Sequence, residues 1–258
     1  MAIEVITPQW PAPVNVGAAI TLCSGGCSRA PFGESNLALH VQDDPRDVVA
    51  NRQSLKQSLK LPAQPLWLDQ VHGTEIVSAS KVCESESSGT PKADGSYSDE
   101  AGAVCAVLTA DCLPVLLCDS IGSQVAAAHA GWRGLCGGIL RKTVATFKQP
   151  PDQMLAYLGP AIGPQVFEVG GEVLQAFLDH AQNPQQQKAI AAAFTLRESA
   201  GDKYLADLYA LARAELKASG VTQIYGGDYC SYSDSERFYS YRREPKTGRN
   251  GSLIWLRG

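Results

Sequence analysis

The chain alternates between short apolar runs and polar turns, and the length of each run predicts its structure. Residues 104–108, 115–118, 125–128 and 155–158 are continuous apolar runs, which are typical of strands buried on both faces. Mixed runs at 66–71, 223–225, 238–243 and 252–256 predict further strands. Several of these runs end in turns that contain glycine, aspartate or proline, where α/β proteins carry functional residues.

Four segments have the spacing of amphipathic helices. In residues 45–59, Asp44 is placed to cap a helix that starts at Pro45, and Val48, Arg52 and Leu55 share one face. Residues 135–147, 172–180 and 202–219 predict three more helices, the last ending at Gly220. The polar segment 83–92 predicts a surface loop. With no internal repeat and no linker, the pattern predicts one domain over residues 1–258, of α/β or α+β class, with mixed sheets flanked by helices.

Composition narrows the functional classes. A chain of 258 residues with 45% hydrophobic content can bury a large core, and a net charge of −4 argues against nucleic acid as a partner. The apolar stretch 103–118 is too short and too interrupted to span a membrane. The chain starts without the pattern of a secretory signal, so its eight cysteines are expected to be reduced thiols in the cytoplasm. A small-molecule substrate is therefore expected.

Three residues follow or end the predicted core strands: His72 in QVHG, Cys112 in TADC and His129 in AHAGWRG, and the chain has only four histidines. Two imidazoles and a thiolate suit zinc or another borderline-soft metal, and three protein ligands would leave a fourth position for water or substrate. Their spacing fits no short zinc-finger pattern. Two hydrogen-bonded core histidines and a buried thiol are the alternative for the residues taken singly; the trio together favours a catalytic metal site.

Neighbouring polar residues suggest roles around such a metal. Asp111 could orient a histidine, act as a general base or cap a turn. Arg133, in a glycine-rich turn before a predicted helix, could hold phosphate or could pair with a surface carboxylate. His40 could be a general acid. Arg242, Arg243 and Arg249 form a C-terminal basic group that either faces the same cleft or is solvated. Cys230 could be a nucleophile, a fourth metal ligand or a packing residue.

Several sequence blocks together resemble the YfiH-like family, which is also labelled multicopper polyphenol oxidase or laccase-domain and purine nucleoside phosphorylase. The resemblance extends from about Pro8 to Leu256, and the blocks that carry it are QVHG, TADCLPVLLCD, AHAGWRG, YLGPAIGP, FEVGGEV, GGDYCSYSD and FYSYRR. Matched motif by motif, the family's zinc ligands fall on the trio already selected from the residues: His72, Cys112 and His129.

The resemblance implies packed mixed sheets flanked by helices, with zinc as cofactor and copper as a possible substitute. It also implies phosphorolysis of inosine, guanosine and adenosine, cleavage of methylthioadenosine, and adenosine deamination, by a monomer or homodimer. On this basis Asn36, His40, Arg133 and Arg242 are predicted to contact nucleoside or phosphate, and Asp111 to assist the metal ligands. Our hypothesis at this point is that Arg133 binds the phosphate.

The chain departs from the family pattern at two places near its N-terminus. Cys23 and Cys27 stand where the family usually has the arginine and valine of TR-x-GGVS. Ala38 and Gln42 replace two glycines of LNLG-x-H-x-GD, while three polar residues remain: Asn36, His40 and Asp43. If the missing arginine contacts substrate in relatives, affinity is altered here.

Three other functions compete with phosphorolysis. Copper-dependent oxidation of phenols follows from the family's older label, but four scattered histidines cannot hold a cluster of several coppers. Editing of peptidoglycan precursors is linked to a bacterial branch of the family and would use the same metal-assisted hydrolysis. A non-enzymatic, metal-stabilised binding protein would need a closed four-ligand site, with Cys230 as the fourth ligand.

Overall fold

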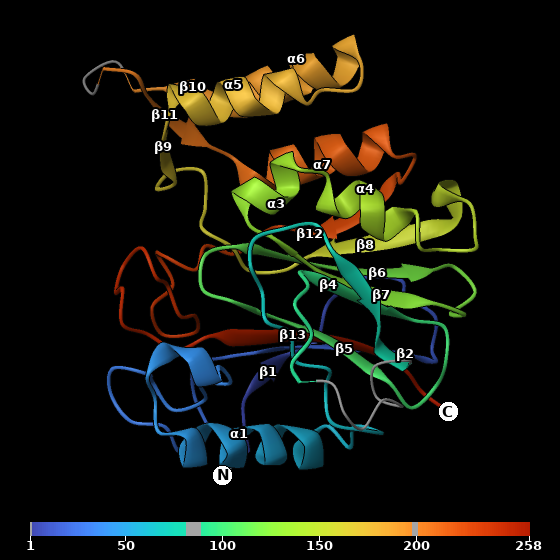
Figure 1. Ribbon diagram of the computed structural model, residues 1–258, viewed down its shortest axis with the longest axis vertical. Helices are drawn as coiled ribbons and strands as arrows, with labels where there is room; N and C mark the ends of the chain where they lie inside the picture. The colour runs from blue at the N-terminus through green and yellow to red at the C-terminus, as the bar shows by residue number, and fades with distance from the viewer. Residues whose placement is uncertain (1, 81–88, 198–200) are drawn as a thin grey trace.

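A four-stranded and a six-stranded β-sheet lie face to face at the centre of the molecule, with one helix outside the four-stranded sheet and several outside the six-stranded one (Figure 1). This arrangement comes from a computed structural model that describes residues 2–80, 89–197 and 201–258. It matches the predicted class of mixed sheets flanked by helices.

The four-stranded sheet is antiparallel throughout and has the order β1-β2-β13-β5. Its strands are β1 (Val5–Ile6), β2 (Val16–Thr21), β13 (Asn250–Leu256) and β5 (Val104–Thr109). Helix α1 (Pro45–Ser58) packs against its outer face through Leu55, which is fully buried with Leu253 and Ala106. The chain's first and last long strands, β2 and β13, are therefore neighbours in one sheet.

The six-stranded sheet has the order β12-β8-β6-β7-β4-β3. Its strands are β12 (Gln223–Gly226), β8 (Met154–Leu158), β6 (Leu113–Asp119), β7 (Val125–Ala130), β4 (Gly95–Ser98) and β3 (Ile76–Ser78). The outer pairs are parallel and the inner ones antiparallel. Its inner face packs on the four-stranded sheet through a core that includes Leu116, Val107 and Ile254.

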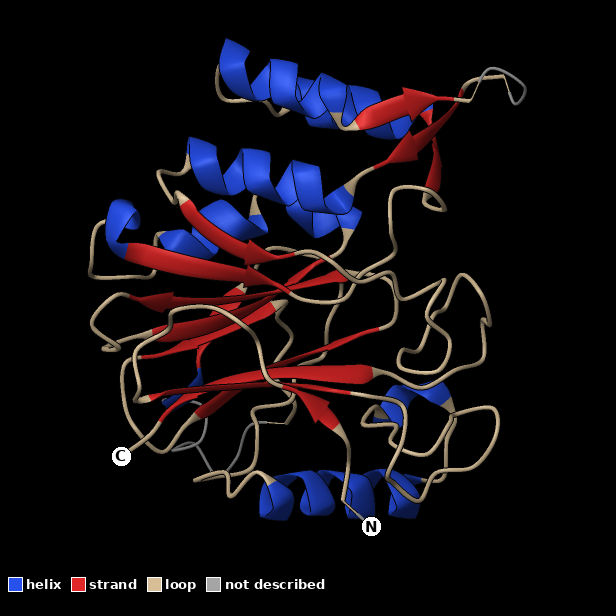
Figure 2. Cartoon of the chain, turned by 180° about the vertical axis from the view of Figure 1, so that it is seen from behind, coloured by secondary structure: helices blue, strands red, loops and turns tan. Residues whose placement is uncertain are grey.

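Helices cover the other face of the six-stranded sheet in two layers (Figure 2). Next to the sheet lie α3 (Trp132–Cys136), α4 (Ile139–Val144) and α7 (Leu208–Ala218). Beyond them are two helices and a small sheet: α5 (Gly171–Asp179), α6 (Pro184–Ala192), β9 (Glu168–Gly170), β10 (Phe194–Leu196) and β11 (Lys203–Ala206). Two 3-10 turns complete the set, η1 (Leu39–Val41) and η2 (Pro151–Gln153).

The sequence correctly predicts the buried strands β5, β6 and β7 and the N-cap of α1. Every residue of β5, β6 and β7 is buried, as their continuous apolar character predicts. The Asp44 side chain accepts a hydrogen bond from the Arg46 N–H at 2.9 Å, so the predicted cap of α1 is confirmed.

Two predicted helices are interrupted. The segment 135–147 covers the end of α3 and all of α4, and the two helices are separated where Gly138 adopts a left-handed backbone with φ of 89°. The segment 202–219 begins as strand β11, and α7 starts only at Leu208, where the Asp207 side chain accepts the Ala210 N–H. Capping at Asp207 sets this boundary.

Two predicted strands do not form. Residues 66–71 are paired only at single residues, Leu66 with Cys105 and Asp69 with Lys92. Residues 238–240 are irregular and residues 241–243 form a turn. The Arg243 guanidinium group holds this segment by donating to the backbone carbonyls of three residues: Ser231, Tyr232 and Phe238. In both segments, isolated bridges or side-chain hydrogen bonds take the place of continuous pairing with a neighbouring strand. Of the predicted loop 83–92, residues 83–88 lie outside the described residues.

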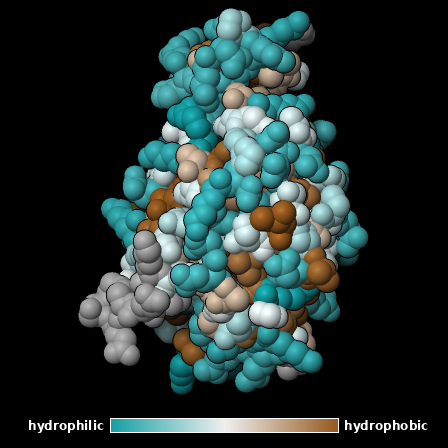
Figure 3. Space-filling view, turned by 90° about the vertical axis from the view of Figure 1, so that its right-hand side faces the viewer, coloured by the Kyte–Doolittle hydropathy of each residue, from teal (hydrophilic) through white to brown (hydrophobic). Residues whose placement is uncertain are grey.

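None of the described helices is both long and apolar enough to cross a bilayer. The face shown in Figure 3 is mainly hydrophilic, with small separate hydrophobic areas.

Candidate metal centre and its cavity

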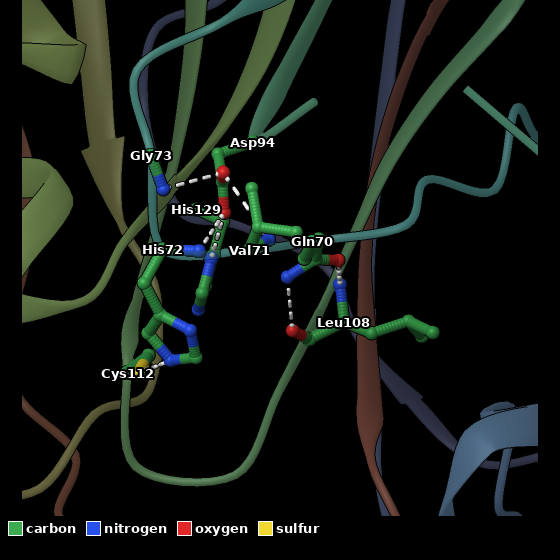
Figure 4. Close-up of polar contacts among 8 residues, drawn as sticks. All are labelled: Gln70, Val71, His72, Gly73, Asp94, Leu108, Cys112 and His129. Carbon is green, nitrogen blue, oxygen red and sulfur yellow. Dashed lines mark hydrogen bonds and ion pairs between the residues drawn. The ribbon is translucent and has the colours of Figure 1, made fainter. Parts of the chain in front are cut away.

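His72, Cys112 and His129 come together in the structure, as predicted (Figure 4). The Cys112 Sγ lies 3.7 Å from the His72 Nε2, and the centroids of the two imidazole rings are 4.8 Å apart. One potential ligand atom from each residue lies within 4.8 Å of the others. His129 is on the central strand β7, Cys112 in the β5–β6 turn and His72 in the turn before β3.

A fully buried carboxylate, Asp94, positions both histidines. One of its oxygens lies 2.9 Å from the His129 Nδ1, so the Nε2 of that ring is left to face the cluster. The same carboxylate accepts three successive backbone N–H groups, from Val71 at 3.3 Å, His72 at 2.9 Å and Gly73 at 2.6 Å. Asp94 therefore fixes the ring of His129 and the turn that carries His72.

The backbone is strained on either side of the cluster. His72 has a φ of 59° and Asp111 a φ of 94°, both in the region that side chains other than glycine rarely adopt. Such conformations cost about 1–3 kcal/mol each and persist where surrounding bonds enforce them. At His72 those bonds are the three N–H groups held by Asp94.

The charges of the trio are coupled. Burial raises the pKa of the Cys112 thiol, but the His129 and His72 imidazoles outweigh it and lower that pKa to about 6. Burial lowers the pKa of His129, yet the Cys112 thiolate and the Asp94 carboxylate raise it to about 9. Without a metal, the pair at neutral pH is therefore a thiolate beside an imidazolium.

The cluster fits a metal of the zinc type. Tetrahedral zinc with one sulfur and one nitrogen ligand places those atoms about 3.5 Å apart, close to the 3.7 Å between Cys112 Sγ and His72 Nε2. Gly131 leaves room for such an ion: a Cβ at this position would lie 2.8 Å from the Cys112 Sγ and 3.0 Å from the His72 Cδ2. No other group of three or more His, Cys, Asp or Glu side chains in the described ranges could hold a metal.

A cavity of about 510 Å³ opens onto the cluster. Its wall includes all three trio residues and the predicted site residues Asp111, Arg133, His40 and Arg242. The loop around η1 and the C-terminal loop before β13 lie on the same side of the molecule (Figures 1 and 2). The cavity thus brings together residues from the first and last fifth of the chain.

Asp111 does not orient a histidine in this structure. Its carboxylate accepts a hydrogen bond from the Ser231 hydroxyl at 2.7 Å and one from the Arg242 N–H at 2.7 Å. It ties the β5–β6 turn to the C-terminal loops, and Asp94 takes the role that the sequence suggested for Asp111.

The predicted substrate contacts are held in different ways. Arg133 and Arg242 are exposed at the cavity wall, where their guanidinium groups lie over Trp132 at 4.4 Å and over Phe167 at 5.6 Å. Asn36 lies outside the wall: it is fully buried, and its Oδ1 accepts the Arg249 N–H at 3.0 Å. Asn36 therefore affects the cavity indirectly, by holding the backbone of Arg249.

The sequence did not single out the aromatic part of the wall. Trp132, Phe167 and Tyr241 line the cavity, and Tyr241 is 56% exposed, which is unusual for so large a side chain. Gln70 also lines it and exchanges two hydrogen bonds with the backbone of Leu108, at 2.8 and 2.7 Å. One sequence feature could have pointed to Asp94: it is an acidic residue next to a glycine, directly before strand β4.

The other cysteines in the described ranges are not part of the cluster. Cys230 accepts the Gly163 N–H at 3.2 Å and is not part of the metal-ligand group, so it is not a fourth ligand here. Cys23 donates to the Glu236 carbonyl at 3.0 Å and does not line the cavity. Gln42, which replaces a family glycine, has a φ of 69°. That left-handed backbone explains why glycine is usual at this position.

Comparison with known proteins identifies a matching family and two named bacterial relatives. Residues 17–257 match the family described as multi-copper polyphenol oxidoreductase laccase. A relative named purine nucleoside phosphorylase YfiH, from Escherichia coli K12, is 49% identical over 98% of this chain and 99% of its own length. A purine nucleoside phosphorylase of Pseudomonas aeruginosa is 50% identical over 97% of this chain and 98% of its own length.

Solved structures show the same fold. A Neisseria meningitidis protein at 48% identity superposes with a TM-score of 0.90, covering 98% of this chain and 99% of that one. YlmD from Geobacillus stearothermophilus, at 31% identity, gives 0.84 and covers 99% and 100%. The chain therefore belongs to the YfiH family, described as multi-copper polyphenol oxidoreductase laccase.

Proposed function

We propose that the protein is a metal-dependent purine nucleoside phosphorylase with zinc as its metal. The observation that carries this proposal is an open His-Cys-His cluster at the base of a cavity with both aromatic and cationic walls. Apolar rings suit a purine base and guanidinium groups suit phosphate. The names of the Escherichia coli and Pseudomonas aeruginosa relatives support the same activity.

The cavity residues have separate roles in this reaction. The three ligands hold the metal, and Asp94 keeps His129 and His72 in place. Bound zinc would supply Lewis-acid polarisation of a substrate oxygen or nitrogen. Trp132, Phe167 and Tyr241 pack on the purine and exclude water, while His40, Arg133 and Arg242 contact the ribose and phosphate.

In phosphorolysis, hydrogen phosphate itself supplies the proton that the leaving purine takes up. A phosphate oxygen forms a bond to C1′ of the ribose as the bond from C1′ to the purine nitrogen breaks. The electron pair of that bond goes to the purine, which takes up the proton lost by hydrogen phosphate. The products are ribose 1-phosphate and the free base, and positioning accounts for much of the rate.

We extend the proposal to methylthioadenosine and to deamination of adenosine. In deamination, water adds to the purine C6 and ammonia leaves, and this step needs the metal and the base-binding wall but no phosphate. Phosphorolysis and deamination should therefore respond differently to changes in the cationic wall.

Two other functions fit the site less well. Copper can bind the same donors. A cluster of several coppers lacks ligands, however, since His180 bonds to the Ala176 carbonyl in the helical layers and only His40, His72 and His129 line the cavity. A structural metal would need a closed ligand shell, and Cys230 is not in the cluster. No feature of the cavity favours a peptidoglycan precursor.

The thiols support a proposal for the cellular setting. None of the seven cysteines in the described part of the chain forms a disulfide, which fits a reducing compartment. We therefore propose a cytoplasmic enzyme, monomeric or dimeric, that acts on small molecules.

Chromatographic analysis of the products tests this function. Zinc-loaded protein is incubated with inosine or adenosine, with and without phosphate, beside the His72→Ala and Cys112→Ala variants. We expect phosphate-dependent ribose 1-phosphate and free base from the wild type and none from either variant. No turnover by folded, zinc-loaded wild type would reject the proposal.

A further inference from the structure

The cationic side chains of the cavity differ in how firmly they are held. The side chains of Arg133 and Arg242 are exposed and lie over aromatic rings, and the Arg242 guanidinium group also donates to the Glu168 carbonyl at 3.4 Å. The guanidinium group of Arg249 lies over the Tyr241 ring at 5.8 Å. Arg249 is half-buried in the same wall. The sequence alone could not separate these three residues.

Arg249 is fixed at both its backbone and one end of its guanidinium group. Its N–H donates to the Oδ1 of the fully buried Asn36, whose Nδ2 donates in turn to Asp43 at 2.9 Å. Its Nη1 donates to the carbonyls of Thr247 and Gly248, both at 2.9 Å. The guanidinium group is therefore preorganised.

The opposite edge of the guanidinium group forms no hydrogen bond to the described part of the chain. Throughout the described ranges, Nε and Nη2 of Arg249 donate to no protein acceptor, and no carboxylate forms an ion pair with this residue. These two nitrogens form the edge that binds two oxygens of a phosphate or carboxylate side by side. A partly buried charge without a counter-ion is costly, and a bound anion removes that cost.

Arg249 lines the same cavity as the three metal ligands. Burial lowers the pKa of Arg249, and the nearby charges of Cys112 and Asp111 partly offset that effect. Partial burial also lowers the pKa of His40, and the charge of Arg249 lowers it further. A neutral His40 next to Arg249 can donate one more hydrogen bond to an anion.

We propose that Arg249 is the main phosphate-binding residue of the cavity, with its Nε–Nη2 edge facing the anion and His40 beside it. Asn36 is a positioning residue that acts through the backbone of Arg249. The inference rests on the proposed function and revises the expectation that Arg133 binds the phosphate. Arg133 and Arg242, both exposed, would then attract anions toward the cavity rather than fix them.

Titration of zinc-loaded protein with inorganic phosphate, followed by ³¹P NMR and calorimetry, tests the subsite without turnover. We expect Arg249→Gln to weaken phosphate binding about 30-fold or more, and Arg249→Lys about fivefold, since lysine keeps the charge and loses the two-point contact. Arg133→Gln should weaken it less than Arg249→Gln does. Arg46→Gln, a change of one fully exposed charge on α1, should leave it unchanged. Zinc content and inosine affinity should stay within about twofold in both Arg249 variants.

Two results would overturn the subsite: phosphate affinity within twofold of wild type in Arg249→Gln, or a larger loss in Arg133→Gln than in Arg249→Gln. If Arg249→Gln does not fold, Arg249→Lys carries the test, and unchanged phosphate affinity there counts against a two-point contact. Arg249-dependent phosphate binding by a wild type that forms no ribose 1-phosphate would support the subsite and reject the phosphorylase.

Discussion

The two sides of the cavity are built differently. On the metal side, His129 is 3% exposed on a central strand, and Asp94 satisfies the groups around it. On the opposite side, Tyr241, Arg242 and His40 are exposed and belong to turns and loops. The metal ligands thus lie on a central strand or in turns beside the strands, and Asp94 holds the His72 turn. The recognition groups of the opposite side come from segments far apart in the sequence.

The metal side is suited to precise placement of its ligands, whereas the loop side can adapt to the substrate. A metal ligand must stay within about 0.5 Å of its place, so rigid strands and buried hydrogen bonds suit it. Contacts to a base or phosphate tolerate small movements, and loops can vary without disturbing the core. Changes on the metal side should therefore affect metal binding and turnover together, whereas changes on the loop side should affect substrate affinity alone.

The largest effect should come from the ligands themselves. Cys112→Ala and His72→Ala each remove one of three ligands, so bound zinc and ribose 1-phosphate formation should both fall below detection. Metal analysis after dialysis measures the bound zinc, and product chromatography measures ribose 1-phosphate. Cys230→Ala is the matched control and should keep both, because Cys230 is outside the cluster. Loss of zinc in that control would contradict the assigned ligand set.

Asp94→Asn should have the next largest effect. Loss of the carboxylate frees the His129 ring and weakens the three bonds that hold the His72 turn, so zinc affinity should fall about 10–100-fold. Competition with a chromophoric chelator measures this change. Asp111→Asn is the control and should change zinc affinity less, since Asp111 contacts Ser231 and Arg242 instead. Equal losses would mean that the metal side is not organised by Asp94.

Metal binding should also depend on pH. Between pH values of about 6 and 9, the respective pKa values of Cys112 and His129, the metal-free site holds a thiolate and an imidazolium. Zinc must then displace one proton from His129, and its affinity should rise about tenfold per pH unit across this range and level off above it. Calorimetry in buffers of different ionisation enthalpy counts the protons. A pH-independent affinity from 6 to 9 would contradict this charge state.

The smallest effect should come from the aromatic wall. Tyr241→Ala should raise the KM for inosine about tenfold through lost stacking, with zinc content unchanged. Tyr241→Phe keeps the ring and should stay close to wild type. Steady-state kinetics at saturating phosphate measure both variants. A fall in kcat with an unchanged KM would place Tyr241 on the chemical rather than the recognition side.

Local sequence signals predicted the core strands, the cap of α1 and the metal trio, because each depends on a short pattern of residues. They missed Asp94, since its partners in the His72 turn and at His129 lie far from it in the sequence. They placed strands at 66–71 and 238–243 because apolar and aromatic residues alone do not show which backbone groups are paired elsewhere. Arg249 was distinguished from Arg133 only by the bonds to Asn36, Thr247 and Gly248.

One metal ion at His72, Cys112 and His129 is proposed to support phosphorolysis. Titration of metal-free protein with zinc, while ³¹P NMR follows ribose 1-phosphate formation from inosine and phosphate, tests this directly. We expect a linear rise in activity that ends at about one zinc per chain and is absent in His72→Ala. Full activity in the metal-free protein, or equal activity in His72→Ala, would contradict it.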